Sequence, residues 1–216
     1  MSAAKTKRAK HDAYLTPDRL AQALVTKTAH IIRDDGNLLD SALEPSAGEG
    51  AFVRGLYKHF NGYPRPRICA VEPRAAAVAK LQKLPMPAGV ALYCMTFEQW
   101  AAQRAAEPEV LDLIIGNPPF SHAEQHIALA RKHARYVAFL LRLSMLGSQR
   151  RAQTLWNTPG LLAVVPLAQR PAFIWPRKKK KGTDNSEYGL FVWRHGYSGD
   201  AVLHRPLVLD NPKKHD

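Results

Sequence analysis

The chain has 216 residues, 46% of them hydrophobic, which is enough apolar material for one substantial core. Its 31 Lys and Arg residues against 18 Asp and Glu give a formal net charge of +13, an imbalance that favours nucleic acid as the partner. The sequence has no run of ~18 apolar residues, and its first residues carry no apolar signal segment. These features argue against a membrane-spanning helix and predict a cytoplasmic protein with no membrane partner.

Cysteine and histidine usage predicts neither a disulfide nor a metal site. Cys69 and Cys94 lie inside the short apolar runs "RICAVE" and "VALYCM", so we expect both to be buried, unreactive thiols. His122 and His126 are spaced to share one face of a helix, but no third ligand is evident beside them. This cysteine usage is consistent with a reducing compartment.

The first predicted element is a helix in "TPDRLAQALVTKTAHII", with Thr16 as its cap and Pro17 at the first helical position. Residues 1–13 are expected to form a basic disordered tail, 14–209 a single domain and 210–216 a second tail. Five strand-then-helix units follow the first helix, and such units favour an α/β fold with a parallel sheet covered on both faces. Their strands are expected in "NLLDSALEP", "RICAVEP", "VALYCM", "LDLIIGNPPF" and "YVAFLLRL".

The order of elements changes in the last third of the chain. Residues 161–167 predict a sixth strand, a Pro-rich basic stretch covers 168–187, and two further strands are expected at 188–195 and 201–209. Because no helix separates these last two strands, we expect them to form an antiparallel hairpin at the C-terminal end of the sheet.

In a parallel sheet, ligands bind beyond the carboxyl ends of the strands, so the residues that follow each strand are candidates for a site. The first strand is followed by "EPSAGEG", whose glycines allow a sharp turn and close approach of a ligand to the main chain. This loop lacks the G-x-G-x-x-G spacing of a dinucleotide site, and Glu44 and Glu49 would repel phosphate. A cationic ligand without phosphate fits better, and Glu72 is placed to accept the hydroxyls of a ribose. An ordinary tight turn and a solvated strand end are the alternative for each motif alone.

Four motifs in this order resemble those of the class I methyltransferases, and specifically of the DNA adenine methyltransferases that modify an amino group. They are "YLTP" (14–17), "EPSAGEG" (44–50), "VEP" (71–73) and "NPPF" (117–120). The resemblance implies a Rossmann-like fold with a mostly parallel seven-stranded sheet. It also implies S-adenosylmethionine as the cofactor, bound by Tyr14, Thr16, Pro17, Glu44, Ser46, Ala47, Gly48, Glu72, Thr96, Phe97 and Asn117.

One position departs from the family pattern. The family commonly has an Asp before the Phe of its third-strand motif, where the carboxylate bonds the adenine amine of the cofactor, and this chain has Thr96 there. A threonine hydroxyl can accept the same hydrogen bond more weakly, or Glu98 can reach the position instead. The resemblance still implies that Phe97 covers the cofactor ring.

The resemblance assigns catalysis to Asn117, Pro118, Pro119 and Phe120, and the chemistry of these residue types explains why. The amine of adenine is a poor nucleophile because its lone pair is delocalised into the ring, and two acceptors that bond both hydrogens can localise that pair. The Asn117 amide oxygen and the Pro118 main-chain oxygen are the expected acceptors, held in fixed directions by the prolines. Phe120 offers a stacking plane for a base extruded from its duplex, and an ordinary hydrophobic cover over the strand end is the alternative.

A run of five cations lies between Pro176 and Gly182, in a connection that the resemblance places beside the target-base pocket. We expect this run to contact backbone phosphates, and a solvated loop is the alternative. The run consists of Arg177, Lys178, Lys179, Lys180 and Lys181. The expected lining of the base pocket is Arg170, Phe173, Trp175 or Tyr188.

Three other functions stay open on the sequence alone. Ribosomal RNA guanine-N2 methyltransferases also carry "NPPF", and protein glutamine methyltransferases use a similar Asn-Pro-Pro-aromatic motif. The third is a DNA-binding protein with an inactive methyltransferase fold. "YLTP" directly before the glycine loop favours transfer to the N6 amine of adenine in duplex DNA, with RNA as the alternative substrate.

Family members of this motif order often carry a further recognition domain, and this chain ends about 20 residues after "FVWRH". We therefore expect a short or relaxed target sequence, as in solitary or phage-type enzymes.

Overall fold

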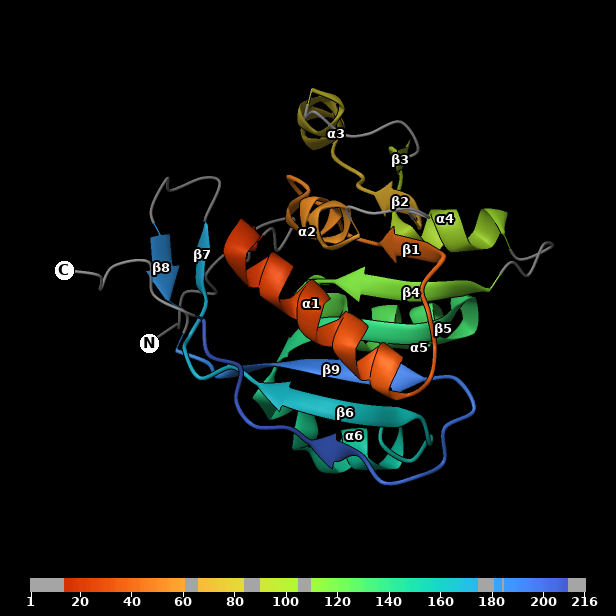
Figure 1. The fold of residues 1–216 in the computed structure, drawn as a ribbon, viewed down its shortest axis with the longest axis vertical. Helices are drawn as coiled ribbons and strands as arrows, with labels where there is room; N and C mark the ends of the chain where they lie inside the picture. Colours follow the sequence, from red (N-terminus) through yellow and green to blue (C-terminus); the bar gives the residue numbers. More distant parts are fainter. Residues whose placement is uncertain are drawn as a thin grey trace, which may run out of the picture.

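The computed structural model describes residues 14–60, 66–83, 90–104, 110–174, 181–183 and 185–209, with the backbone alone at 174 and 181–183. An eight-stranded sheet forms its centre, in the order β10-β6-β9-β5-β4-β1-β2-β3, and β7 pairs with β8 separately (Figure 1). The strands are β1 (Ser41–Glu44), β2 (Arg67–Val71), β3 (Val90–Tyr93), β4 (Leu111–Gly116), β5 (Ala134–Arg142), β6 (Leu161–Pro166), β7 (Ala172–Ile174), β8 (Lys181–Thr183), β9 (Tyr188–Arg194) and β10 (Val202–Leu203). The helices are α1 (Asp18–Asp34), α2 (Ala51–His59), α3 (Ala75–Gln82), α4 (Phe97–Gln103), α5 (Ala123–His133) and α6 (Gln149–Gln153), with 3-10 turns η1 (Phe120–His122) and η2 (Leu143–Leu146).

Strand directions confirm the predicted α/β fold with a mostly parallel sheet. β1 is parallel to β2 and β4, β2 to β3 and β4 to β5, whereas β9 runs antiparallel between β5 and β6. An antiparallel pair at this end of the sheet is present as predicted, but β9 forms it with β6 and β5. The predicted pairing of 188–195 with 201–209 is wrong, because both edges of β9 are already paired. β10 instead pairs parallel with β6, so the sheet has eight strands, the number that the apolar runs indicate, whereas the resemblance implies seven.

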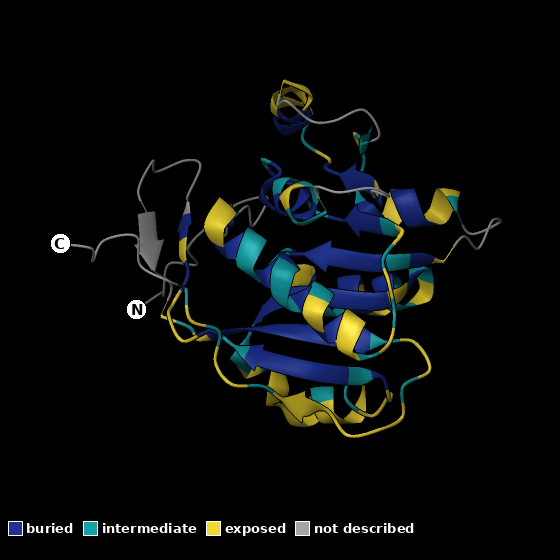
Figure 2. Ribbon diagram, in the orientation of Figure 1, coloured by how far each residue is buried: buried dark blue, intermediate teal, exposed yellow. Residues whose placement is uncertain are grey.

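The central strands bury both of their faces. Successive strand side chains point to opposite sides of a sheet, so an uninterrupted apolar run fills two layers at once. In β4, Leu113 and Ile115 belong to the layer that contains α1, whereas Ile114 belongs to the layer that contains α4 and α5. Figure 2 shows the central strands buried along most of their length. This double burial explains why these strands read as continuous apolar segments.

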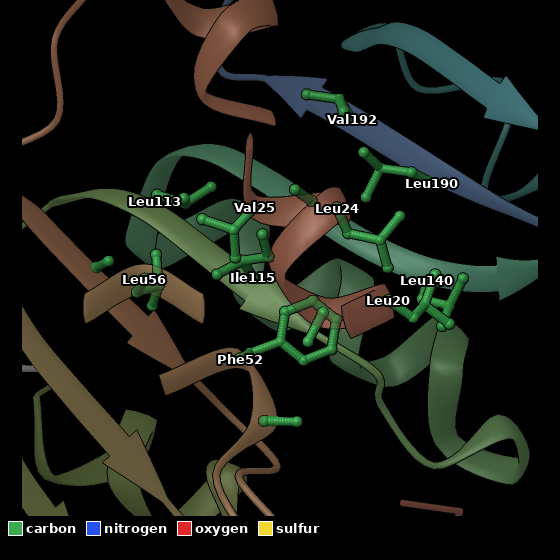
Figure 3. Close-up of a cluster of buried hydrophobic side chains, with 14 of the residues drawn as sticks. Leu20, Leu24, Val25, Phe52, Leu56, Leu113, Ile115, Leu140, Leu190 and Val192 are labelled. Atoms are coloured by element: carbon green, nitrogen blue, oxygen red, sulfur yellow. The ribbon is translucent and has the colours of Figure 1, made fainter. Parts of the chain in front are cut away.

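The α1 helix closes the first layer. Leu20, Ala21 and Leu24 recur at helical spacing and are all buried, as predicted. A Cβ atom added to Gly55 in α2 would lie 3.3 Å from the Gln22 backbone, so glycine lets α2 approach α1 closely. Figure 3 shows the resulting contact of α1, α2, β4, β5 and β9 through Leu20, Leu24, Val25, Phe52, Leu56, Leu113, Ile115, Leu140, Leu190 and Val192.

Two local predictions are wrong. Thr16 does not cap α1, because the helix begins after Pro17 and the Thr16 hydroxyl accepts a hydrogen bond from Asn117 instead. Cys94 is exposed, because β3 ends one residue before it, whereas Cys69 is buried as predicted. The local sequence pattern misplaced the start of α1 in the first case and the end of β3 in the second.

The strand order reverses between β1 and β4. From β1 the sheet continues to β2 and β3 on one side, and to β4 and β5 on the other, so the loops after β1 and β4 diverge and leave a crevice. These loops carry "EPSAGEG" and "NPPF". The arrowheads of β1, β4 and β6 point toward the side of Figure 1 on which β7 and β8 lie. The two strongest motifs therefore meet where this type of fold binds ligands.

Within the described ranges, no helix combines the length and the apolar character needed to cross a membrane. Nor do three or more His, Cys, Asp or Glu side chains of those residues gather as a metal site would require.

Leu24→Ala should lower the free energy of unfolding by about 2–5 kcal/mol, because the fully buried leucine would leave a cavity between α1 and the sheet. Urea denaturation followed by circular dichroism measures this loss. Leu38→Ala is the matched control, since Leu38 is 78% exposed and its truncation should change the free energy of unfolding by less than about 0.5 kcal/mol. Equal losses in the two variants would contradict the place of Leu24 in the core.

Candidate active site

A cavity of about 440 Å³ opens at the reversal of strand order. Its volume falls in the range of small-molecule sites. Three of the predicted cofactor residues, Glu72, Thr96 and Phe97, lie outside its walls. The other predicted cofactor residues line it together: Tyr14, Thr16, Pro17, Glu44, Ser46, Ala47, Gly48 and Asn117.

The glycine loop turns sharply because two of its residues have left-handed backbone. Gly48 has a φ of 57° and Gly50 a φ of 83°, conformations that cost other residues free energy. Ala47 N donates to Val71 O at 2.9 Å, and Gly50 N donates to Ala47 O at 2.7 Å. These bonds fix the loop against β2, and the main chain of Ser46, Ala47 and Gly48 forms part of the cavity wall.

Glu44 is a buried acid in the same wall. Its side chain is almost inaccessible to solvent, and its Oε2 accepts a hydrogen bond from Val53 N at 3.1 Å. Burial raises the pKa of Glu44 well above its usual 4.5, and the nearby Glu72 raises it further, while the Val53 N–H and Arg54 act in the opposite direction. A cation in the cavity would lower the cost of ionising this carboxyl, so the wall favours a positively charged ligand.

The N-terminal segment holds the side chain of Asn117. Its Nδ2 donates to Tyr14 O at 3.2 Å and to Thr16 Oγ1 at 3.1 Å. Because a main-chain carbonyl only accepts hydrogen bonds, these contacts determine which end of the amide faces the segment. The opposite atom, Oδ1, is buried and has no hydrogen-bond partner within the described residues. Since an unpaired buried acceptor is costly, such an atom on a residue that lines a cavity is suited to a donor that arrives with a substrate.

Phe120 lies in an aromatic cluster beside the cavity. Its ring centroid is 5.2 Å from that of Tyr14, 5.5 Å from Tyr188 and 6.3 Å from Phe173. The guanidinium carbon of Arg142 lies 4.8 Å from the centroid of the Phe120 ring. Phe173 and Tyr188 are fully buried, so in this structure they support Phe120 from behind and do not present a free ring face.

Glu72 supports the glycine turn and pairs with Arg74. Its Oε2 accepts a hydrogen bond from Gly48 N at 2.8 Å, and its Oε1 accepts from Arg74 N at 2.9 Å and Arg74 Nε at 2.7 Å. The bond to Glu72 raises the pKa of Arg74. Both carboxylate oxygens are therefore engaged. Binding of ribose hydroxyls by Glu72 requires Arg74 to shift, and that role stays a prediction.

The predicted motif after the third strand, Thr96 and Phe97, forms the N-terminus of α4. Thr96 Oγ1 accepts from Gln99 N at 3.2 Å, and the Gln99 side chain accepts from Thr96 N at 2.9 Å, which caps α4. Phe97 is buried in the second core layer, with its ring centroid 5.9 Å from that of Trp100. Glu98 Oε1 lies 3.6 Å from Nε2 of His126, a buried residue of α5. The structure thus gives Phe97 a core position and does not bring it to the cavity.

The predicted nucleic-acid residues are described only in part. Arg177, Lys178, Lys179 and Lys180 lie outside the described residues, as does Trp175. The backbone of Lys181 begins β8 and pairs with β7. Arg170 is half-exposed and forms an ion pair with Glu187, with 2.7 Å between Nη2 and Oε1. The phosphate contacts of this basic run stay a prediction.

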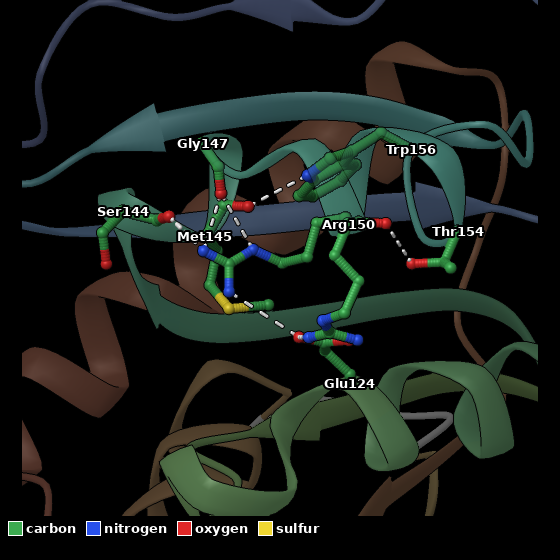
Figure 4. A network of polar contacts seen from close by, with 8 residues as sticks. Glu124, Ser144, Met145, Gly147, Arg150, Thr154 and Trp156 are labelled. Atoms are coloured by element: carbon green, nitrogen blue, oxygen red, sulfur yellow. Dashed lines mark hydrogen bonds and ion pairs between the residues drawn. The ribbon is translucent and has the colours of Figure 1, made fainter.

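A polar network braces the chain after "NPPF" (Figure 4). Glu124, in the first turn of α5, forms ion pairs with Arg150 and Arg151 of α6, and the hydrogen bond from Arg150 lowers the pKa of Glu124. Arg151 also donates to the carbonyls of Ser144 at 2.9 Å and Gly147 at 2.6 Å. The network ties the start of α5 to η2 and α6, and so restrains the turn that precedes α5.

Sequence reasoning missed several residues of the cavity wall. Arg54 forms an ion pair with Asp18 and donates to Glu49 O at 2.6 Å, so it links α1, α2 and the glycine loop. The sequence indicated this linking role of Arg54 only through its position in the first turn of α2, next to the glycine loop. The wall residues that were not predicted as site residues are Leu15, Asp18, Glu49, Ala51, Phe52, Arg54 and Ala172.

Comparison with known proteins relates this geometry to a fold. A scan of protein-family models and a search of curated proteins each return no match to the sequence. Among solved structures, the methyltransferase subunit of a type I restriction-modification system from Streptococcus thermophilus is similar, with a TM-score of 0.68 and 13% identity over 89% of this chain. This chain has the class I methyltransferase fold. It spans 47% of the length of that subunit.

Two further solved structures share the fold. A protein from Pyrococcus horikoshii described as an RNA methyltransferase gives a TM-score of 0.62 at 14% identity, over 90% of this chain and 92% of its own. A protein from Listeria monocytogenes described as a class I S-adenosylmethionine-dependent methyltransferase gives 0.63 at 13% identity, over 95% of this chain and 70% of its own. The shared fold therefore covers 89–95% of this chain in the three comparisons.

Glu44→Gln should stabilise the ligand-free protein, and the gain should grow as the pH rises. Because the pKa of Glu44 is raised on folding, the folded protein keeps this proton where the unfolded chain has released it, so stability falls as the pH rises above the usual 4.5. Glutamine removes that loss. Thermal unfolding of both proteins from about pH 4 to about pH 8 measures the difference.

Glu124→Gln is a control of opposite sign for this measurement. The pKa of Glu124 is lowered on folding, so the stability that its carboxylate contributes is present above its unfolded pKa and is lost as the pH falls. The loss caused by Glu124→Gln should therefore grow as the pH rises. A gain from Glu44→Gln that did not change with pH would contradict the raised pKa of the buried Glu44 carboxyl.

Proposed function

We propose that the protein is an S-adenosylmethionine-dependent methyltransferase that acts on the exocyclic N6 amine of adenine in duplex DNA. The observation that carries this proposal is the buried, unpaired Oδ1 of Asn117 at the cavity. An amine with two hydrogens is a donor that such an acceptor can bind and orient. Tyr14 and Thr16 hold the Nδ2 end of the amide, which supports a role for Oδ1 as the acceptor.

The chemistry of the cavity fits the cofactor. Glu44 offers a buried carboxyl to the positive charge of the ligand, and the left-handed turn at Gly48 allows close approach to the main chain. S-adenosylmethionine, when bound, supplies an electrophilic methyl group on a sulfonium centre. The solved structure from Listeria monocytogenes is described as dependent on the same cofactor, which supports this choice.

The residues of the "NPPF" turn would hold and orient the amine. Asn117 Oδ1 would accept one amine hydrogen, and the Pro118 carbonyl is proposed to accept the second, so that the nitrogen lone pair is localised. Pro119 O accepts from His122 N at 2.9 Å, which closes η1 and fixes the turn. Positioning of this kind can supply about 7–11 kcal/mol of the barrier, and stacking on Phe120 can add about 1–3 kcal/mol to base binding.

Charge and motif order support duplex DNA as the substrate. The net charge of +13 favours a polyanion, and a base inside a duplex must be extruded before its amine can reach the cavity. The "YLTP" segment, which favours a DNA adenine enzyme, is the element that holds Asn117. One structural neighbour belongs to a restriction-modification system, whereas another is described as an RNA methyltransferase and supports RNA as the alternative.

An assay with labelled S-adenosylmethionine tests the proposal. The purified protein is offered unmethylated duplex DNA, ribosomal RNA and peptide, and the product is digested and identified by mass spectrometry. We expect label in DNA, as N6-methyladenine. Label on guanine in RNA would replace the proposal with the RNA alternative. Cofactor binding without transfer to any substrate would favour a non-catalytic DNA-binding protein.

Asn117→Ala should lower kcat by about 10²- to 10³-fold, because it removes a preorganised acceptor at the reacting nitrogen. Its affinity for S-adenosylhomocysteine, measured by calorimetry, should fall by much less than kcat, because the lost bonds to Tyr14 and Thr16 loosen only one wall of the cavity. Asn37→Ala is the matched control: Asn37 bonds Asp35 O and Arg135 near the opposite edge of the sheet, so its loss should leave kcat unchanged. Equal losses of turnover and cofactor affinity in Asn117→Ala would contradict the division of roles.

A further inference from the structure

Arg142 is the last residue of β5, the strand that pairs with β4. Its side chain reaches across to the turn that follows β4. The guanidinium carbon lies 4.8 Å from the centroid of the Phe120 ring, and Nε donates to the Tyr188 hydroxyl at 3.3 Å. A planar cation therefore covers the ring on which the substrate base is proposed to stack.

A guanidinium and a nucleic-acid base compete for the same kind of surface. Both are flat, delocalised groups that stack on aromatic faces, the first by cation–π attraction and the second by base stacking. The base therefore needs the face that Arg142 now covers. The base can replace the Arg142 guanidinium on the Phe120 ring only if the guanidinium gains another interaction partner.

The other neighbours of Phe120 are less able to move. Phe173 and Tyr188 are fully buried in the aromatic cluster, and the main chain of Tyr14 is held by the bond from Asn117 to its carbonyl. Arg142 is a long charged side chain that is only half-buried. Among these described neighbours, Arg142 has the long, charged and partly exposed side chain that is best suited to exchange the ring for another partner. Backbone phosphate is the partner that its guanidinium would meet in a nucleic-acid substrate.

We propose that Arg142 gates the target-base pocket: it covers the Phe120 ring in the free protein and moves to a backbone phosphate when an extruded base takes its place. This inference rests on the proposed function, because it needs both a base and a phosphate. It assigns Arg142 a positioning role, and it makes base entry and phosphate contact one coupled event.

Arg142→Ala, Arg142→Lys and the control Arg135→Ala test the gate on mixed-sequence unmethylated duplex DNA. Arg135 belongs to the same strand but lies at its opposite end, where it pairs with Asp112. In Arg142→Ala the log–log salt slope of DNA binding should fall by about one unit and KM for DNA should rise about five- to tenfold, with kcat retained. Arg142→Lys should restore the slope, because it restores the charge. Arg135→Ala should behave as the wild type.

Deoxyadenosine separates the gate from a structural role, because it carries the base without a backbone phosphate. It should inhibit Arg142→Ala at a lower concentration than it inhibits the wild type, since the ring is uncovered. A merely structural role would weaken binding of both DNA and nucleoside. Affinity for S-adenosylhomocysteine checks that each variant is folded.

Each remaining outcome is decisive. If the wild type methylates DNA but Arg142→Ala keeps the wild-type salt slope, KM and nucleoside inhibition, the gate is wrong and the proposed function stands. If Arg142→Ala and Arg142→Lys lose activity equally with no change in slope, Arg142 acts only through packing. If the wild type transfers no methyl group to nucleic acid, the proposed function fails and the gate falls with it.

Discussion

The two hydrogen bonds from Asn117 Nδ2 to Tyr14 O and Thr16 Oγ1 are the constraint on which the site depends. They join residues about a hundred positions apart in the chain, and they fix both the N-terminal segment and the end of β4. They also leave Oδ1 buried without a partner in the described structure. The reversal of strand order brings Asn117 and the glycine loop into the wall of one cavity, where a small ligand has room. The orientation of the Asn117 side-chain amide is thus set by the fold, and the proposed chemistry depends on that orientation.

The cavity concentrates groups that are unfavourable in the ligand-free protein. Glu44 is an acid held in a setting that disfavours its charge, and Asn117 Oδ1 lacks a donor. Such groups lower stability unless a ligand satisfies them, so they are informative about the ligand: a cation for the first and a hydrogen-bond donor for the second. The two apolar layers on either side of the sheet provide the stability that lets the site carry these costs.

Much of the fold and part of the site could be predicted because they depend on local patterns. Apolar runs predict buried strands, and the glycines of "EPSAGEG" predict the turn at Gly48. Side-chain pairings were not predictable, because they depend on which elements become neighbours: Arg74 engages the predicted ribose acid, and Arg142 crosses from β5 to the "NPPF" turn. The exposure of Cys94 was not predicted for a related reason, since it depends on where β3 ends. Phe97 lies in the core at the start of α4, and its contact with the cofactor ring stays a prediction.

The central claim is that Asn117 presents an unpaired oxygen to the reacting amine, and a crystal structure with S-adenosylhomocysteine bound tests it most directly. The account predicts that the sulfur lies in the cavity between the N-terminal segment and the glycine loop, with Asn117 Nδ2 still bonded to Tyr14 and Thr16. Oδ1 should face the space beyond the sulfur. A ligand bound elsewhere, or an Oδ1 that is bonded to the protein and directed away from the sulfur, would contradict the account.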